Sequence, residues 1–361
     1  MKQGWEIKKL GEVCEVIGGS TPKTSDDTFW DGDYYWISPA ELDGSKYVYS
    51  TTRTITDAGV RSAHLQILPI GTVLLSSRAP IGKVAITKVP MYCNQGFKNL
   101  VCGKDLINEY VYWFLKHNTD YLNSLGTGAT FKEISKKVVE QIPIPVPPIA
   151  EQEKIVAELD CLSGIIEKKK QQLKELDNLA QSIFYEMFGD PVENDKGWET
   201  KKVIDVVKLQ RGYDLPIQHR QSDGGIPVWG SNGIVGWHNE AKVDYGVITG
   251  RSGTLGTVYS YDKPFFPLNT TLFSVDTHGN DIVYLKYLLN IFDLKRFGTG
   301  TGVPTLNRNV FHSEPIISVP LTLQQDFTSK IESIEKQKEL IAKSIKETET
   351  LFNSRMDYYF N

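Results

Sequence analysis

The chain has 361 residues, of which 40% are hydrophobic and 23% are charged, and its net charge is −4. These values are typical of a folded protein with two or three domains, and the balanced charge alone does not indicate a nucleic-acid partner. No run of about 20 apolar residues predicts a membrane span, and the N-terminus lacks the apolar run of a signal peptide. We therefore expect a cytoplasmic protein without a membrane partner. Four cysteines without Cys-x-x-Cys spacing favour free thiols, and the six histidines show no metal-ligand spacing.

The chain contains two copies of one pattern. Residues 4–9 (Gly-Trp-Glu-Ile-Lys-Lys) return as residues 197–202 (Gly-Trp-Glu-Thr-Lys-Lys), 193 positions later. Near the end of each copy, Val146–Glu153 matches Val319–Asp326 at an offset of 173. The second copy therefore carries a net deletion of 20 residues. Internal similarity at this length predicts two folded modules that are built alike.

Each module alternates short β-like runs with glycine, proline, asparagine and serine. In the first module we expect strands near Thr72–Leu75 and Val84–Thr87 and a helix near Glu109–His117. In the second module we expect a strand near Val247–Thr249 and a helix near Ile282–Ile291. This mixture predicts α+β modules.

A long helix is predicted after the first module. Ile142–Pro148 cannot lie inside a helix, because proline lacks the N–H donor and clashes with the preceding turn. Beyond it, apolar residues recur at steps of four and three, as in the seam of a coiled coil, until Gly189 and Pro191 end the helix. The seam residues are Ile155, Leu159, Leu162, Ile166, Leu173, Leu176 and Ile183.

The second module is followed by the same pattern. Its helix is predicted to start at a capping box formed by Thr322 and Gln325. Each seam includes one lysine, Lys169 or Lys338, which either fixes the register of the helix pair or extends to solvent. The apolar seam residues are Phe327, Ile331, Ile334, Ile341, Ile345 and Phe352.

Two helices of roughly 35–40 residues would each be about 50–60 Å long. We expect them to pair antiparallel, with one module at each end, so that the pair acts as a ruler of about one and a half turns of duplex DNA. The fold class is therefore α+β: two similar globular domains separated by two long antiparallel coiled-coil helices, with pseudo-two-fold symmetry. The predicted division is 1–147 and 191–320 for the modules, 148–190 for the central helix and 321–361 for the C-terminal helix.

Several motifs occur in the same order in both copies. They are the opening Gly-Trp-Glu-x-Lys-Lys, the segment Leu74–Gly82 with its counterpart Thr249–Gly256, and the glycine–threonine loops at 126–130 and 300–305. Pro-x-Pro-x-x-x-Glu-Gln-x-x-Ile leads into the first long helix. With these motifs, essentially the whole chain resembles the specificity subunit of type I restriction–modification systems.

The resemblance implies that each module is a target recognition domain that reads one half of a bipartite target in double-stranded DNA. It also implies that the helices set the gap between the two halves and dock two DNA methyltransferase (modification) subunits. Those subunits would bind S-adenosylmethionine and methylate adenine, and separate restriction subunits would use ATP. The resemblance implies no catalysis by this chain and no cofactor or metal of its own.

Sequence-specific contact requires forked donors and amide side chains at groove edges, with other groups gripping phosphates. Arg78 and Arg251, matched at an offset of 173, either contact DNA or form structural salt bridges. The asparagines either contact bases or shape turns, and the glycine–threonine loops either hold phosphates or are flexible turns. Trp229 is expected in the core. The candidates are Arg78, Asn94, Gln95, Lys98, Thr127 and Thr130 in the first module and Asn232, Arg251, Ser252, Asn269, Thr270, Thr301 and Thr305 in the second.

Residues 24–70 of the first module face only residues 217–243 of the second, so we expect the modules to read different half-sites. The alternative function is a polysaccharide-acting enzyme, because Asp26–Trp36 combines acidic and aromatic residues as a glycan cleft does. A solvated loop beside aromatic core residues would produce the same pattern. A third interpretation is a purely structural coiled-coil partner. No Walker-type phosphate loop occurs, which argues against ATP hydrolysis by this chain.

Overall fold

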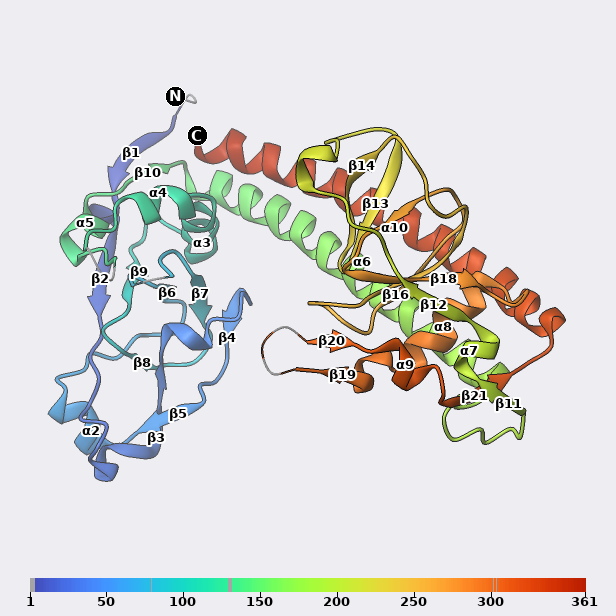
Figure 1. Ribbon diagram of the computed structural model, residues 1–361. Helices are drawn as coiled ribbons and strands as arrows, with labels where there is room; N and C mark the ends of the chain where they lie inside the picture. The colour runs from blue at the N-terminus through green and yellow to red at the C-terminus, as the bar shows by residue number, and fades with distance from the viewer. Residues whose placement is uncertain (1–3, 79, 129–131, 301, 303) are drawn as a thin grey trace. The chain divides into compact units, whose positions relative to one another are not determined.

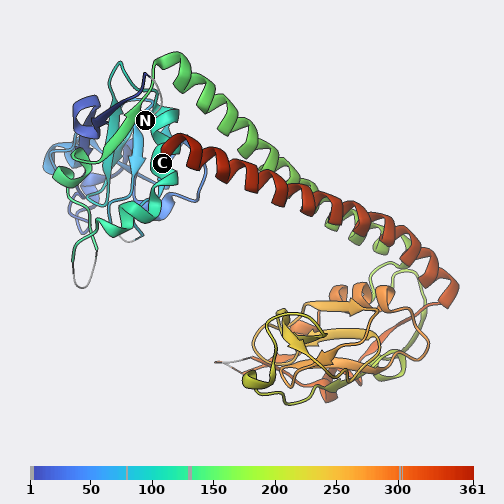
Figure 2. The same cartoon turned by 90° about the horizontal axis from the view of Figure 1, so that it is seen from above.

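The computed structural model describes residues 4–78, 80–128, 132–300, 302 and 304–361, and the chain divides into two compact units. The first unit extends to Lys168 and also includes Ser344–Asn361, whereas the second is Lys169–Lys343. Two unbroken 40-residue helices, α6 (Ile149–Phe188) and α10 (Leu321–Phe360), each have one part in either unit (Figures 1 and 2). They occupy the stretches predicted as spacer helices. No helix in the described part of the chain is long and apolar enough to cross a membrane.

The first unit, here called unit 1, is built from short strands with helices on the sheet. A five-stranded sheet has the order β2-β9-β6-β7-β4, and a three-stranded sheet has the order β5-β3-β8. A separate pair, β1–β10, joins the start of the unit to the segment before α6. The elements are β1 (Glu6–Lys9), α1 (Leu10–Val13), β2 (Cys14–Gly18), η1 (Asp27–Phe29), β3 (Trp30–Ile37), η2 (Pro39–Glu41), β4 (Tyr47–Val48), β5 (Arg53–Ile55), α2 (Asp57–Ser62), β6 (Val73–Leu75), β7 (Val84–Thr87), β8 (Tyr92–Cys93), β9 (Lys98–Cys102), α3 (Asn108–His117), α4 (Thr119–Ser124), α5 (Lys136–Glu140) and β10 (Pro143–Val146).

The second unit, unit 2, repeats this plan, but its residues 217–243 replace the longer stretch 24–70 of unit 1. Its sheets have the orders β12-β18-β15-β16 and β14-β13-β17, with the pairs β11–β21 and β19–β20 beside them. The elements are β11 (Glu199–Lys202), α7 (Val203–Val206), β12 (Lys208–Arg211), η3 (Ile217–His219), β13 (Ile226–Gly230), β14 (Gly233–His238), β15 (Gly246–Gly250), β16 (Val258–Tyr261), β17 (Phe266–Pro267), β18 (Thr271–Asp276), α8 (Ile282–Ile291), η4 (Leu294–Phe297), β19 (Gly298–Thr299), β20 (Thr305–Leu306), α9 (Arg308–Phe311) and β21 (Pro315–Ser318). The predicted strands near 72–75, 84–87 and 247–249 and helices near 109–117 and 282–291 are confirmed within one residue at each end.

The long helices complete the core of each unit with aromatic side chains. In unit 1, Phe360 of α10 lies 5.4 Å from Tyr110 of α3 between ring centroids. In unit 2, Tyr284 of α8 stacks on Phe184 of α6 at 5.9 Å, and Phe327 of α10 lies 5.6 Å from Phe184. Because buried aromatic side chains remove large apolar areas from water, each globular part depends on both helices for its stability.

Buried glutamines, not the predicted capping box, hold the helix starts. The Gln152 amide donates to Pro147 O and Asp105 O, both at 2.8 Å, and its Oε1 accepts from Ile107 N at 2.9 Å. Gln324 does the same in unit 2, with Val319 O at 2.9 Å and Asp281 N at 2.9 Å.

The capping box predicted at Thr322 and Gln325 is wrong, because α10 begins at Leu321 and Thr322 lies inside its first turn. Gln152 therefore corresponds to Gln324, 172 positions later. The offset of 173 used for this region is one residue too long.

The paired helices run antiparallel. Near the start of α6, Glu158 contacts Arg355 of α10 in unit 1, and further along α6 Asp177 contacts Lys338 in unit 2, with 2.7 Å between the charged atoms. Lys338 is thus held across the helix pair instead of extending to solvent. None of the predicted seam residues is exposed. Those that are buried are Ile155, Leu159, Ile166, Phe327, Ile331, Ile334 and Ile345, and those that are half-buried are Leu162, Leu173, Leu176, Ile183, Ile341 and Phe352.

Candidate nucleic-acid interface

In unit 1, the segment after β6 lies against the glycine–threonine loop. Ile134 N donates to Ser77 O at 2.9 Å, and Thr127 and Glu133 exchange two backbone hydrogen bonds of 3.1 and 2.9 Å. This ladder places Arg78 opposite Glu133, with 2.9 Å between Nε of the arginine and Oε2 of the carboxylate. The expected salt-bridge alternative for Arg78 is therefore the arrangement that the structure contains.

Lys98 closes a small ionic cluster around the same carboxylate. Its Nζ lies 3.3 Å from Glu133 Oε1 and 3.3 Å from Ser77 Oγ. Burial alone would raise the pKa of Glu133, but hydrogen bonds from Arg78 and Lys98 lower it below its usual value. The cluster therefore contains an ionised carboxylate between two cations. The Arg78 side chain remains 45% exposed and can reach a partner.

The turn between β8 and β9 lies next to this cluster. Ser77 N donates to Gly96 O at 2.7 Å. Asn94 Oδ1 accepts a hydrogen bond from Gly96 N at 2.8 Å, which is the turn-shaping role weighed for asparagine at this position. Gln95 Oε1 accepts from Thr21 Oγ1. The structure thus brings Arg78, Gln95 and Lys98 to one rim with Thr127, whereas Thr130 lies outside the described residues.

In unit 2, the corresponding segment follows β15. The backbone N–H groups of Arg251 and Ser252 donate to Thr270 O at 2.8 and 3.2 Å, and Leu306 N donates to Arg251 O at 2.8 Å. Ser252 also pairs with Thr305. The structure therefore gathers Arg251, Ser252, Asn269, Thr270 and Thr305 at one rim, while Thr301 lies outside the described residues.

Asn232 reaches this rim from the tip of the β13–β14 hairpin. It is exposed in the two-residue turn between Gly230 and Gly233. A Cβ built on Gly250 would lie 3.2 Å from Ser231 Cβ, so the hairpin tip lies against the end of β15. Trp229 is 7% exposed and lies against Tyr259, which confirms its expected place in the core.

Two arginines at this rim were not anticipated. A pocket of about 450 Å³ in unit 2 is lined by Arg211 and Arg308 together with Arg251, Thr299 and Thr305. Arg211 pairs with Asp214 at 3.2 Å, whereas Arg251 and Arg308 have no carboxylate partner among the residues described. Asn307, which caps α9 by accepting from Asn309 N at 3.1 Å, directly precedes Arg308 and is a local signal that could have indicated a fixed position.

Strand registers change the equivalence between the modules. Leu75 pairs with Val84 in unit 1 and Thr249 pairs with Val258 in unit 2, so these positions match at an offset of 174. Arg251 thus corresponds to Ser77, and Arg78 corresponds to Ser252. The match of Arg78 with Arg251 is wrong, because the shared arginine drew the alignment one residue out of register.

The glycine–threonine loops are also offset. Thr127 pairs with Glu133 and Thr299 pairs with Thr305, each across the mouth of its loop. Gly126–Gly128 therefore corresponds to Gly298–Gly300, not to the run starting at Gly300. The side chain that matches Glu133 is Thr305.

The acidic and aromatic loop of unit 1 forms a small core. Trp30 and Trp36 are 6% and 4% exposed, and their rings meet edge to face at 5.1 Å. The Arg53 guanidinium lies 3.5 Å from the centre of the Trp30 ring, and Asp26 caps a turn by accepting from Thr28 N. These contacts fit the core interpretation and do not support a glycan cleft. Across the described residues, no group of three or more His, Cys, Asp or Glu side chains could hold a metal ion.

Comparisons with known proteins agree with this architecture. A family model described as the type I restriction modification DNA specificity domain matches residues 2–178 and 195–350. The type I restriction enzyme MjaIX specificity subunit of Methanocaldococcus jannaschii is 38% identical over 231 residues, which cover 59% of this chain and 54% of that protein. The EcoR124I/EcoR124II specificity subunit of Escherichia coli is 33% identical over 162 residues, which cover 43% and 40%. The chain thus spans about half the length of these curated relatives.

The whole chain has counterparts among solved structures. The S subunit of a type I restriction–modification system from M. genitalium superposes with a TM-score of 0.64 at 15% identity, covering 99% of this chain and 96% of that one. A chain from a study of complex assembly in the type I R-M system has a TM-score of 0.60 at 17% identity, covering 100% and 98%. At these identities the likeness shows a shared fold.

Proposed function

Because the chain belongs to the family of type I restriction modification DNA specificity domains, we propose that it selects the DNA sequence on which a type I restriction–modification complex acts. Each unit contacts one half of a bipartite target in double-stranded DNA. The chain itself catalyses no reaction. Since its partner is DNA, we place it in the cytoplasm.

The observation that carries this proposal is the pair of equivalent polar rims. In each unit three segments meet at one rim. They are the end of a sheet strand (β6 or β15), the glycine–threonine loop, and the turn before the neighbouring strand (β9 or β18). These segments present arginine, lysine, asparagine, glutamine and threonine side chains. Forked guanidinium and amide groups suit base edges, and hydroxyl and ammonium groups suit phosphates.

The long helices are proposed to dock the methyltransferase subunits and to set the gap between half-sites. Exposed apolar side chains along them support docking: Leu179 on α6 is 48% exposed, and Leu340 and Leu351 on α10 are 68% and 50% exposed. A docked partner would remove these apolar side chains from water. Two methyltransferase subunits would carry S-adenosylmethionine, and restriction subunits would use ATP.

The decisive experiment maps the target and then changes its spacing. Methylated adenines are mapped in cells that express the chain with its methyltransferase, and duplexes are then made with the mapped gap and with one base pair more or less. One base pair rotates one half-site by about 35° relative to the other, so affinity should fall sharply. Equal binding at all three gaps would contradict a fixed spacing.

The competing functions give different results. A glycan-acting enzyme would show turnover with the isolated chain, and this turnover would be lost in Asp31→Asn or Asp33→Asn. A purely structural partner would show no salt-dependent binding of duplex DNA even in the assembled complex.

A further inference from the structure

One position differs in charge between the two rims. Glu133 in unit 1 and Thr305 in unit 2 occupy the same place, since each pairs across the mouth of its glycine–threonine loop and is followed by a residue that donates to the segment after the central strand. The first is a carboxylate and the second is a hydroxyl. Both positions are surrounded by basic side chains.

In unit 1 the basic side chains already have an anion. Arg78 Nε and Lys98 Nζ lie 2.9 and 3.3 Å from the two oxygens of Glu133. The Lys98 side chain is only 13% exposed, so its charge faces the carboxylate instead of solvent. The cluster is therefore compensated within the protein.

In unit 2 no carboxylate stands in the place of Glu133, and Arg251 and Arg308 form no ion pair with a carboxylate among the residues described. Arg211 lies directly opposite Leu272 in the β12–β18 ladder, and the equivalent pair in the β2–β9 ladder is Gly18 opposite Lys98. Directly opposed residues in an antiparallel ladder project on the same face, so Arg211 supplies its charge where Lys98 does in unit 1. Arg251 and Arg308 line the same pocket, and Asp214 is the one carboxylate that pairs with a pocket arginine among the residues described.

We infer that the pocket formed by Arg211, Arg251 and Arg308 binds a phosphodiester of the DNA backbone. The same geometry assigns to Glu133 the role of a built-in anion that takes the place of this phosphate in unit 1. Guanidinium groups offer forked donors that match phosphate oxygens, and the Thr305 hydroxyl lines the same pocket, whereas the Thr299 hydroxyl donates to Thr305 O at 3.3 Å. This inference rests on the proposed DNA recognition and adds that unit 2 supplies more of the phosphate contacts than unit 1.

The test measures duplex binding by the full chain, assembled with its methyltransferase subunits, over a range of NaCl concentrations. Each phosphate that a protein neutralises contributes about −0.9 to the slope of log K against log salt. Arg251→Gln and Arg308→Gln should each make the slope shallower by about one, and Arg308→Lys should retain it. Glu133→Gln should make the slope steeper by about one, because Arg78 and Lys98 become available for phosphate.

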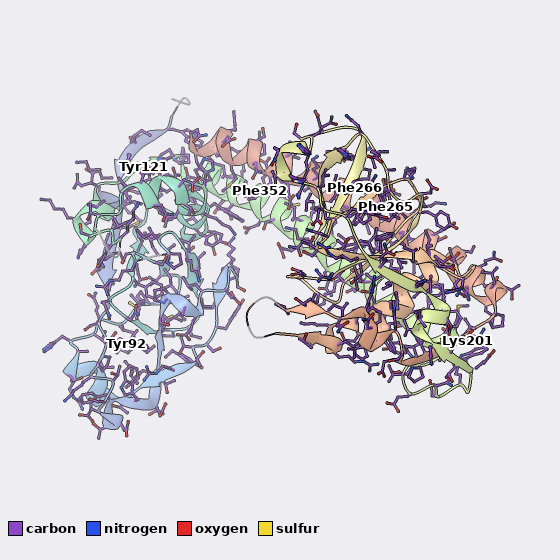
Figure 3. All side chains as sticks on the ribbon, in the orientation of Figure 1. Tyr92, Tyr121, Lys201, Phe265, Phe266 and Phe352 are labelled. Atoms are coloured by element: carbon purple, nitrogen blue, oxygen red, sulfur yellow. The ribbon has the colours of Figure 1, made fainter. Side chains whose placement is uncertain are left out.

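Lys201→Gln is the matched control. It removes one positive charge from unit 2, but Lys201 lies on exposed β11 at the opposite edge of the unit from the β19–β20 hairpin (Figure 3). Its slope should equal that of the wild type. Circular dichroism of each variant shows whether the fold is retained.

The outcomes separate the inference from the proposed function. If wild-type complex binds duplex DNA and the arginine variants keep its slope, the phosphate pocket is refuted while DNA recognition stands. If wild-type complex shows no salt-dependent duplex binding, both fail. A second arm compares thermal unfolding in sodium phosphate and NaCl at equal ionic strength. Stabilisation by phosphate that is lost in the arginine variants, with an unchanged DNA slope, would assign the pocket to free phosphate and overturn the DNA assignment.

Discussion

Arg355, near the end of α10, holds Glu158, near the start of α6, through a bidentate contact. Its Nη2 donates to Glu158 Oε2 at 2.9 Å and its Nε donates to Oε1, while the Tyr359 hydroxyl also donates to Glu158. A forked guanidinium facing both carboxylate oxygens has one favoured geometry. The contact therefore stabilises the antiparallel pairing of the two helices within unit 1.

Replacing Glu158 with glutamine should lower the stability of unit 1 by about 1 kcal/mol, the value for hydrogen bonds to a charged group after screening by solvent. Hydrogen bonds from Arg355, which outweigh the opposing effect of burial, hold the pKa of Glu158 below its usual value of 4.5. A depressed pKa gives stability that is complete above pH 4.5 and is lost as the pH falls through the folded pKa. Denaturant unfolding from pH 7 to pH 3 should show the difference between variant and wild type shrinking in acid.

The control for this experiment is Glu153→Gln, an exposed position about one and a half turns earlier on α6. It should behave as the wild type at every pH. A constant difference between Glu158→Gln and the wild type down to pH 3 would show that the contact contributes nothing through its charge.

Replacing the buried glutamines at the helix starts should greatly reduce the free energy of unfolding. Gln152→Ala leaves the Ile107 N–H and the Asp105 carbonyl without their partner, and Gln324→Ala leaves the Asp281 N–H in the same state. An unsatisfied buried polar group costs about 1–3 kcal/mol, so each variant should lose at least about 2 kcal/mol. Exposed Gln171→Ala, which removes one contact to Glu175, should change the stability by less than about 0.5 kcal/mol. Equal losses at all three positions would argue against this role.

His312 should make unit 2 sensitive to mild acid. Its Nε2 accepts a hydrogen bond from Leu209 N at 3.2 Å, so the imidazole is neutral in this contact. Burial, followed by the charges of Arg308 and Lys208, lowers the pKa of His312 below its ordinary value of 6.5. The unfolded chain therefore takes up a proton below pH 6.5 that the folded chain resists, and stability falls as the pH decreases, by at most about 1.4 kcal/mol per pH unit for one proton.

Thermal unfolding between pH 7.5 and pH 5 tests this dependence. His312→Gln should flatten the curve below pH 6.5, whereas His219→Gln, at an exposed position of the same unit, should leave its shape unchanged. A wild-type curve that is already flat over this range would contradict the prediction.

Asn232 should contribute to the base discrimination of unit 2. The side chain stands exposed at the tip of the β13–β14 hairpin, next to Ser231, which lies against Gly250 and Gly253, and an amide there can pair with a base edge. Asn232→Ala should weaken binding of the mapped target by about 1–3 kcal/mol and relax the preference at one base pair. Asn239→Ala, just beyond the other end of β14, is the matched control. A uniform loss over all half-site variants would assign Asn232 to the DNA backbone instead.

The repeats and both long helices could be predicted because the sequence itself carries their signals: repeated motifs, regularly spaced apolar residues, and prolines that cannot lie inside a helix. Prolines near 143–148 exclude a helix, and apolar residues at steps of four and three mark the buried seam from Ile155 onward. The end of α6 departs from that spacing, since Phe184 and Phe188 are fully buried while Ile183 and Met187 are half-buried. There α6 packs against α8 as well as α10, and a two-helix seam does not anticipate a third element.

The rims were harder to predict because their residues come from different strands. Arg211, Arg251 and Arg308 are neighbours only through the strand order β12-β18-β15 and the hairpin β19–β20, which no local pattern encodes. Loops rich in glycine and serine carry no periodicity. The sequence around Arg78 and Arg251 therefore contains no pattern that would fix the alignment of the two segments. A one-residue error of this kind moves a side chain to the other face of a strand.

The packing of Phe352, Met356 and Phe360 into the unit 1 core has a consequence for biosynthesis. During translation, residues 1–168 of unit 1 emerge from the ribosome before unit 2. Unit 1 lacks these three side chains until the last turns of α10 have been translated. Unit 2, whose own core extends only from Leu176 to Ile334, can close before that moment. Of the two units, unit 1 therefore completes its core after unit 2, although most of unit 1 precedes unit 2 in the sequence.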